Sequence, residues 1–175
     1  MRMDNTLPSP VHAVYTVGVN GKGLRKLSLI NDAWEIADWR GGRIVFESTQ
    51  PPEEGLNIWS MRGDGSDRRL IAGQTTVANY RHPHWSPDGR RIVFTNDADG
   101  HEQVWTMNSD GSGQAAVTRG RFGSVEPGWS PDGRKLVYAT VVGNAQPDIF
   151  VANANGSGIR RLTTSKRIDK EPDWR

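Results

Sequence analysis

Short apolar runs separated by polar turns make up most of the chain. Runs at 44–46, 92–94 and 136–138 are too short for helices and carry β-branched and aromatic residues. Pro-Asp-Gly stands just before two of them, and this tripeptide favours a tight turn because Pro presets φ and Gly tolerates positive φ. No ten-residue stretch has helical periodicity, so the pattern predicts a chain of short antiparallel strands.

Two phrases recur along the chain at a fixed spacing. HWSPDGRRIVF at 84–94 returns as GWSPDGRKLVY at 128–138, with weaker relatives at 37–46 and 171–175. Their tryptophans are separated by 46, 44 and 45 residues: Trp39, Trp85, Trp129 and Trp174. A second phrase, which leads into an Asp-Gly or Asn-Gly turn, has anchors separated by 44, 46 and 45 residues: Tyr15, Trp59, Trp105 and Phe150. Periods in this range are typical of propeller blades.

Each repeat divides into four strands. Strand A surrounds the first tryptophan, strand B is the apolar run, strand C holds the second aromatic anchor, and strand D follows the Asp-Gly or Asn-Gly hairpin signal. The predicted fold class is therefore all-β, a β-propeller of four-stranded antiparallel blades in which the strand-A tryptophan fills the core between blades. The chain holds about three and a half blades: a flexible segment 1–10, a C–D pair 11–30, blades 31–75, 76–120 and 121–165, and the start of a further strand A at 166–175.

The complete WSPDG strings at 85–89 and 129–133, each followed by an apolar strand and later a DGSG-like turn, carry a family resemblance. They resemble the TolB-type propeller repeat, and the string at 39–42 is a degenerate copy without Pro. The resemblance implies a scaffold like periplasmic TolB, which binds the lipoprotein Pal and bacteriocins. Related propellers also occur in prolyl-oligopeptidase-like enzymes and oligogalacturonate lyases. A closed ring of this type needs six blades, which leaves three interpretations: a fragment of a longer chain, an open arc, or a ring completed by a second copy.

Composition narrows the classes of partner and compartment. Lys and Arg number 22 against 20 Asp and Glu, a balance that disfavours nucleic acid or an anionic membrane as the main partner. The chain has no cysteine, which excludes disulfides, zinc–thiolate sites and cysteine nucleophiles. No apolar run approaches the roughly 18 residues of a membrane span. The first residues lack the apolar centre of a signal peptide, so we expect either a cytoplasmic protein or, as the resemblance implies, a periplasmic one whose signal was removed.

The segments that join strand D to the next strand A differ between repeats, and binding residues are expected there because loops on a rigid scaffold carry recognition. Their charged and aromatic residues would form a mixed-charge patch at one mouth of the channel, the alternative being solvated loop residues without a ligand. The predicted partner-binding residues are Tyr80, Arg81, His82, His84, Arg121, Phe122, Glu126 and Glu171.

Other chemistry has weaker support. His82 and His84 could supply two metal ligands, yet no second cluster supports them, so no metal and no cofactor is predicted. The sequence 97–100 is interpreted as a turn rather than a calcium loop, because Thr stands where carboxylate ligands belong.

The basic pairs at 25–26, 68–69 and 160–161 are expected to protect strand D from edge-to-edge pairing rather than to bind nucleic acid. No GxSxG, HExxH or phosphate-loop motif is present, so a non-enzymatic, protein-binding scaffold is predicted. The alternatives are an accessory propeller of a larger enzyme and a fragment that self-assembles through open blade faces.

Overall fold

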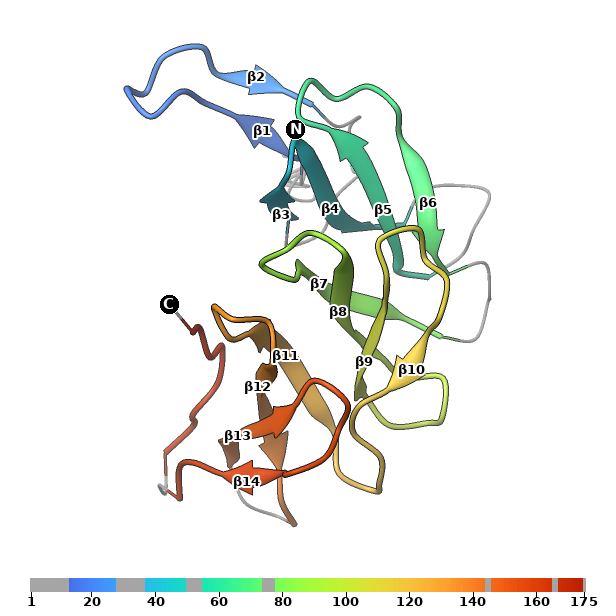
Figure 1. The fold of residues 1–175 in the computed structure, drawn as a ribbon, viewed down its shortest axis with the longest axis vertical. Coiled ribbons are helices and arrows are strands. Elements are labelled where there is room, and N and C mark those ends of the chain that lie inside the picture. The colour runs from blue at the N-terminus through green and yellow to red at the C-terminus, as the bar shows by residue number, and fades with distance from the viewer. Residues whose placement is uncertain are drawn as a thin grey trace, which may run out of the picture.

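The computed structural model describes residues 13–27, 37–49, 55–73, 78–143, 146–164 and 167–174. The regular secondary structure in these ranges consists entirely of β-strands. Figure 1 shows the sheets following one another around an arc. The predicted flexible segment 1–10 lies outside the described residues. The all-β prediction is confirmed.

Three four-stranded antiparallel sheets follow a short two-stranded pair. The pair is β1 (Tyr15–Thr16) and β2 (Arg25–Lys26). The first sheet is β3 (Ala37–Arg40), β4 (Arg43–Ser48), β5 (Asn57–Arg62) and β6 (Arg69–Ala72). The second is β7 (Tyr80–Trp85), β8 (Arg91–Asn96), β9 (Gln103–Asn108) and β10 (Ala115–Ala116). The third is β11 (Ser124–Trp129), β12 (Lys135–Val141), β13 (Pro147–Asn153) and β14 (Arg160–Arg161). In each sheet the strands pair in sequence order, as a blade requires.

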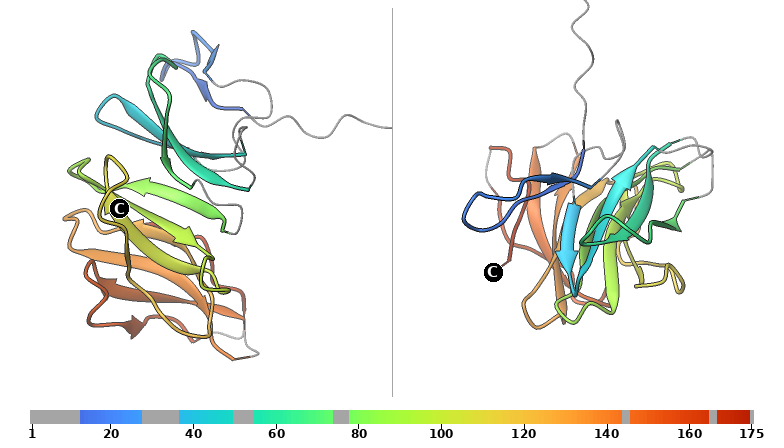
Figure 2. Two further views of the ribbon diagram at one scale, coloured as in Figure 1. Left: turned by 90° about the vertical axis from the view of Figure 1, so that its right-hand side faces the viewer. Right: turned by 90° about the horizontal axis from the view of Figure 1, so that it is seen from above.

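The hydrophobic core lies between the sheets, which stack face to face in the left view of Figure 2. Val45 and Ile58 of the first sheet join Phe94 of the second in one cluster. Val93 of the second sheet joins Tyr138 of the third in the next cluster. Because side chains alternate along a strand, the B strands bury residues on both faces, and each blade covers its neighbour.

The strand-A tryptophans have different environments. Trp85 and Trp129 are 6% and 7% exposed and fill the cores between blades, as predicted. Trp39 is 55% exposed, because the preceding β1–β2 pair supplies only strands C and D of a blade. Trp174 is 38% exposed, so the predicted core role holds for two of the four tryptophans.

The segment 167–174 runs back along the third sheet without forming a strand (Figure 1). Asp169 N donates to Pro147 O at 3.0 Å, and Glu171 N donates to the Glu126 carboxylate at 2.6 Å. These bonds place the segment on the inner side of the arc, where the predicted further strand A would begin.

Candidate functional site

The inner strands of successive blades enclose a groove of about 810 Å³, which we call the axial groove. It is bordered by the three strands β3, β7 and β11 and by the C-terminal segment. Its lining consists of Asp38, Arg40, His82, His84, Trp85, Pro87, Glu126, Pro127, Gly128, Trp129, Pro131, Glu171, Pro172, Asp173 and Trp174. The axial groove is therefore lined by charged side chains together with aromatic residues and prolines.

Bulges on two inner strands shape the groove wall. The pairing register shifts between Arg81 and His84 on β7 and at the equivalent place on β11. His82 and Glu126 lie in these bulges at φ of 53° and 55°, in the left-handed region that few residues other than glycine adopt. Each precedes a proline, which has no N–H for the sheet and suits a bulge. Glu171, also before a proline, repeats the conformation at φ 53°.

Carboxylates of the preceding repeat hold the backbone N–H groups at two of these positions. His82 N donates to Glu47 Oε2 at 2.9 Å, and Glu47 is only 2% exposed. Glu171 N donates to Glu126 Oε2 at 2.6 Å in the same way. At the partly buried His82 an unpaired N–H would be costly, so the Glu47 carboxylate stabilises the left-handed conformation there. The bond at Glu171 is exposed to solvent.

Asp38, His84 and Asp173 bring three repeats together in the groove. Asp38 Oδ2 accepts a hydrogen bond from Trp85 N at 2.7 Å and lies 3.9 Å from His84 Nδ1. Burial lowers the pKa of His84 below its ordinary value, and the negative charges of Asp38 and Asp173 offset only part of this effect. Burial therefore favours the neutral form of the imidazole.

The structure separates the eight predicted residues into two groups. His82, His84, Glu126 and Glu171 all line the axial groove. Tyr80 does not, because it is 8% exposed and stacks on Phe94 in the core between blades, with ring centroids 5.8 Å apart.

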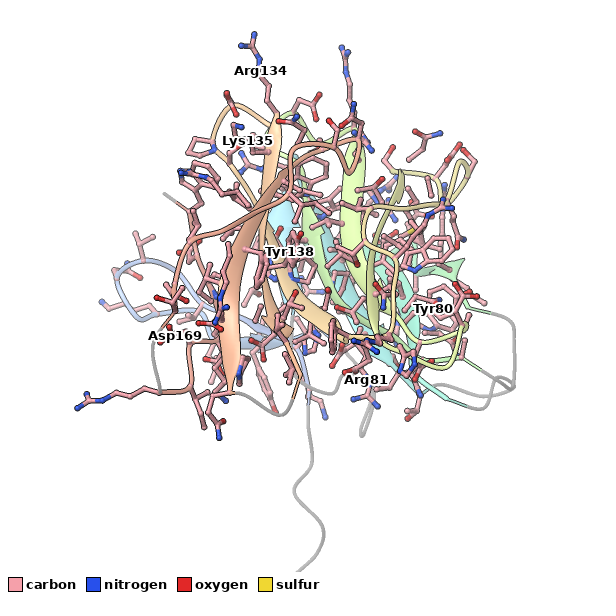
Figure 3. All side chains as sticks on the ribbon, turned by 90° about the horizontal axis from the view of Figure 1, so that it is seen from below. Tyr80, Arg81, Arg134, Lys135, Tyr138 and Asp169 are labelled. Carbon is pink, nitrogen blue, oxygen red and sulfur yellow. The ribbon has the colours of Figure 1, made fainter. Side chains whose placement is uncertain are left out.

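The three remaining residues, Arg81, Arg121 and Phe122, are not part of the groove lining. The Arg121 guanidinium lies 5.0 Å from the centroid of the Phe122 ring. Figure 3 shows Tyr80 and Arg81 at the opposite end of the sheets from Arg134, which follows the WSPDG turn.

Sequence reasoning missed Asp38, Arg40 and Asp173 as groove residues. The signal for two of them was present, because Asp38, His84 and Asp173 each come directly before a strand-A tryptophan. Because successive side chains of a strand point to opposite faces, the residue directly before a tryptophan that faces the neighbouring blade points away from that blade. The charged and histidine side chains before each tryptophan thus line the groove from the positions one and three residues before it.

Other candidate chemistry has a structural account. In the described ranges, no group of three or more His, Cys, Asp or Glu side chains is arranged to hold a metal ion. Asp97 accepts hydrogen bonds from Asn79 N and Nδ2 at 2.6 and 2.9 Å within the second blade, and Asn79 Oδ1 accepts one from Leu56 N of the first blade at 3.3 Å. The same residues include no helix that is long and apolar enough to cross a membrane.

The basic pairs on strand D contact their own blades. Arg68 lies 5.4 Å from the centroid of the Phe46 ring, and Arg69 Nε lies 2.8 Å from Asp67 Oδ1. Arg161 forms an ion pair with the buried Asp148. These contacts give two of the three pairs a structural role on the blade edge.

Comparisons with known proteins agree with the fold. No family model matches the chain. The Tol-Pal system protein TolB of Anaeromyxobacter dehalogenans (strain 2CP-C) is 34% identical over 178 residues, covering 92% of this chain and 40% of that protein. The chain thus spans less than half the length of this curated relative.

Solved structures show the same likeness at lower identity. A protein of Agrobacterium tumefaciens assigned as TolB superposes with a TM-score of 0.75 at 21% identity, covering 86% of this chain and 56% of that one. An oligogalacturonate lyase of Vibrio parahaemolyticus superposes with a TM-score of 0.62 at 16% identity, covering 86% and 42%. Together with the stacked four-stranded blades and the WSPDG turns, these findings identify the chain as a β-propeller repeat protein of the TolB type.

Proposed function

We propose that the protein is a non-enzymatic binding scaffold that holds a protein partner in its axial groove. The relatives' name refers to the Tol-Pal system, so the first partner to test is a Pal protein without its lipid. A periplasmic location is part of the same proposal.

One observation supports the groove above the rest of the surface. The WSPDG turns and apolar strands repeat from blade to blade, whereas the inner residue before the tryptophan varies. It is Asp in two repeats, His in one and Gly in one: Asp38, Asp173, His84 and Gly128. Repeated residues maintain blade stacking, and varied side chains on rigid strands are the ones that can recognise one partner. A volume of about 810 Å³ is within the range of binding pockets.

Calorimetry with the Pal protein tests this site. His84→Ala combined with Glu171→Ala should weaken binding at least about ten-fold, because each removes a side chain from the proposed contact surface. The matched control, His101→Ala with Asp99→Ala, changes the same two kinds of side chain on the exposed turn between β8 and β9. Equal affinity of the two double variants, with both folded, would contradict the groove as the site.

An accessory role in a larger enzyme is the second candidate. The structural likeness to an oligogalacturonate lyase favours it, since that enzyme has the same propeller fold. Incubation with polygalacturonate, followed by absorbance of the unsaturated product, distinguishes the two functions. Product formation that His84→Ala abolishes would support the enzyme and contradict the scaffold.

A further inference from the structure

The axial groove carries a charge opposite to that of the whole chain. Four carboxylates line it, and the lining holds one guanidinium, that of Arg40. The four are Asp38, Glu126, Glu171 and Asp173. The Glu171 carboxylate also pairs with Lys170, whose Nζ lies 3.1 Å from Glu171 Oε1, so three carboxylates remain for a ligand. The chain has a formal charge of +2, so negative charge is concentrated in this hollow. A cleft lined by one sign of charge attracts groups of the opposite sign.

The walls of the groove are apolar and aromatic. Trp174, which is 38% exposed, supplies most of the indole surface. Trp85 and Trp129 add the 6% and 7% that they expose, and four prolines line the rest of the hollow. Arg91 already lies 5.4 Å from the centroid of the Trp129 ring, so a guanidinium is held by an indole of this wall. Such walls suit the aliphatic stem of a Lys or Arg side chain.

Trp85 adds a hydrogen-bond donor. It is 6% exposed, and its Nε1 has no acceptor in the described part of the chain. Trp129 at the equivalent position donates its Nε1 hydrogen to the carbonyl of His84, the groove residue just before Trp85. The residue of the preceding repeat that corresponds to His84 is Asp38, which lines the groove. A buried N–H without an acceptor favours a ligand that brings one, such as a peptide carbonyl.

We propose that the axial groove binds an extended peptide segment that carries a Lys or Arg side chain. The cationic head faces the carboxylates of Asp38, Glu126 and Asp173, and its stem packs on the tryptophan and proline walls. A carbonyl of the peptide backbone accepts from Trp85 Nε1. This inference rests on the proposed function and names the chemistry that the groove recognises in its partner.

Fluorescence anisotropy with three labelled peptides tests the proposal. Ac-Gly-Ser-Lys-Pro-Lys-Ser-Gly-amide is compared with versions in which both Lys residues are Gln or Glu. The Lys peptide should bind at least about ten-fold more tightly than the Gln peptide, the Glu peptide should bind most weakly, and added salt should reduce the difference.

Isosteric variants assign the effect to the groove. Asp38→Asn, Glu126→Gln and Asp173→Asn together keep the acceptor oxygens for Trp85 N and Glu171 N but remove three charges. This triple variant should reduce affinity for the Lys peptide about ten-fold. The control, Asp64→Asn, Asp99→Asn and Asp110→Asn, makes the same change in net charge on exposed turns outside the groove and should keep wild-type affinity.

The outcomes separate this inference from the proposed function. Equal binding of the Lys and Gln peptides, no binding of the Lys peptide, or equal loss in the two triple variants would overturn the cationic peptide. Spermidine binding as tightly as the Lys peptide would overturn it too, because spermidine has the charge without a carbonyl. Loss of Pal binding on His84→Ala with Glu171→Ala in any of these cases would leave the groove as the partner site.

Discussion

At the residue scale, the strand-A tryptophan of each repeat is buried or exposed according to the blade that precedes it. Trp129 is 7% exposed because a complete blade precedes it, whereas Trp39 is 55% exposed next to a two-stranded pair. The motif determines where the side chain points, and the neighbouring blade determines how much of it is buried. The stability that each tryptophan contributes therefore depends on whether it fills an interface between blades, and not on the motif alone.

Replacing these two tryptophans tests that statement. Trp129→Ala should lower the free energy of unfolding by about 3–5 kcal/mol, as for other large core side chains. Trp39→Ala should lower it by less than about 1 kcal/mol, as is usual for exposed sites. Urea denaturation followed by circular dichroism measures both, and similar losses in the two variants would contradict tryptophan-filled blade interfaces.

His84 gives a pH dependence with a definite sign. Burial lowers its pKa in the folded protein, so the unfolded chain binds more protons at this residue below a pH of about 6.5. The free energy of unfolding should thus decrease as the pH falls through about 6.5 toward the lower folded pKa.

His84→Gln should make this decrease smaller, and His101→Gln, on an exposed turn, serves as the control. The measurement is urea unfolding at a series of pH values from about 8 to about 5. A decrease of the same size in the wild type and His84→Gln would show that the neutral imidazole has no part in it.

At the element scale, the C–D hairpin turns hold adjacent blades together. Gly156 has φ 83°, and a Cβ there would lie 2.6 Å from the carbonyl oxygen of Val117 in the preceding blade. Gly65 and Gly111 make similar close approaches to the preceding repeat. The glycine of the Asp-Gly or Asn-Gly turn is therefore required for two reasons. It allows the positive φ of the turn, and it lets the turn approach the backbone of the preceding repeat.

Gly156→Ala and Gly100→Ala separate these two requirements. Gly100 has φ 84° but nothing within 4 Å of the added Cβ, so only the conformational cost applies there. Gly156→Ala should reduce stability by about 1–3 kcal/mol more than Gly100→Ala, because the neighbouring backbone must move. Thermal unfolding of the two variants gives the comparison, and equal midpoints would exclude the inter-blade contact as a source of stability.

Strands and blades were predictable from the sequence because turn chemistry and a fixed period act locally. The groove was only half predictable. His82 and Glu126, predicted on the segments that join strand D to strand A, line it from β7 and β11, yet Tyr80, two residues before His82, lies in the core. The bulge between Arg81 and His84 changes which side chains face inward. The alternation of apolar and polar residues in the sequence does not indicate where this bulge lies.

At the scale of the whole molecule, apolar side chains remain exposed on the last blade. Leu162 is 46% exposed and lines a hollow together with the partly exposed Trp174, and Ile168 is 58% exposed. We expect association that increases with concentration, because exposed apolar surface favours contact between copies. Light scattering measures the mass, and Leu162→Lys with Ile168→Lys should lower it. A constant monomer mass in the wild type at all concentrations would contradict this expectation.

The central claim is that a partner occupies the groove formed by the inner strands. Nuclear magnetic resonance of the indole N–H groups during titration with the Pal protein tests it most directly. Trp85, Trp129 and Trp174 line the groove, whereas Trp59 and Trp105 lie on the C strands outside its lining. We predict that the first three signals shift and the other two stay in place. Shifts confined to Trp59 and Trp105, or no shift at the groove tryptophans under saturating partner, would contradict the account.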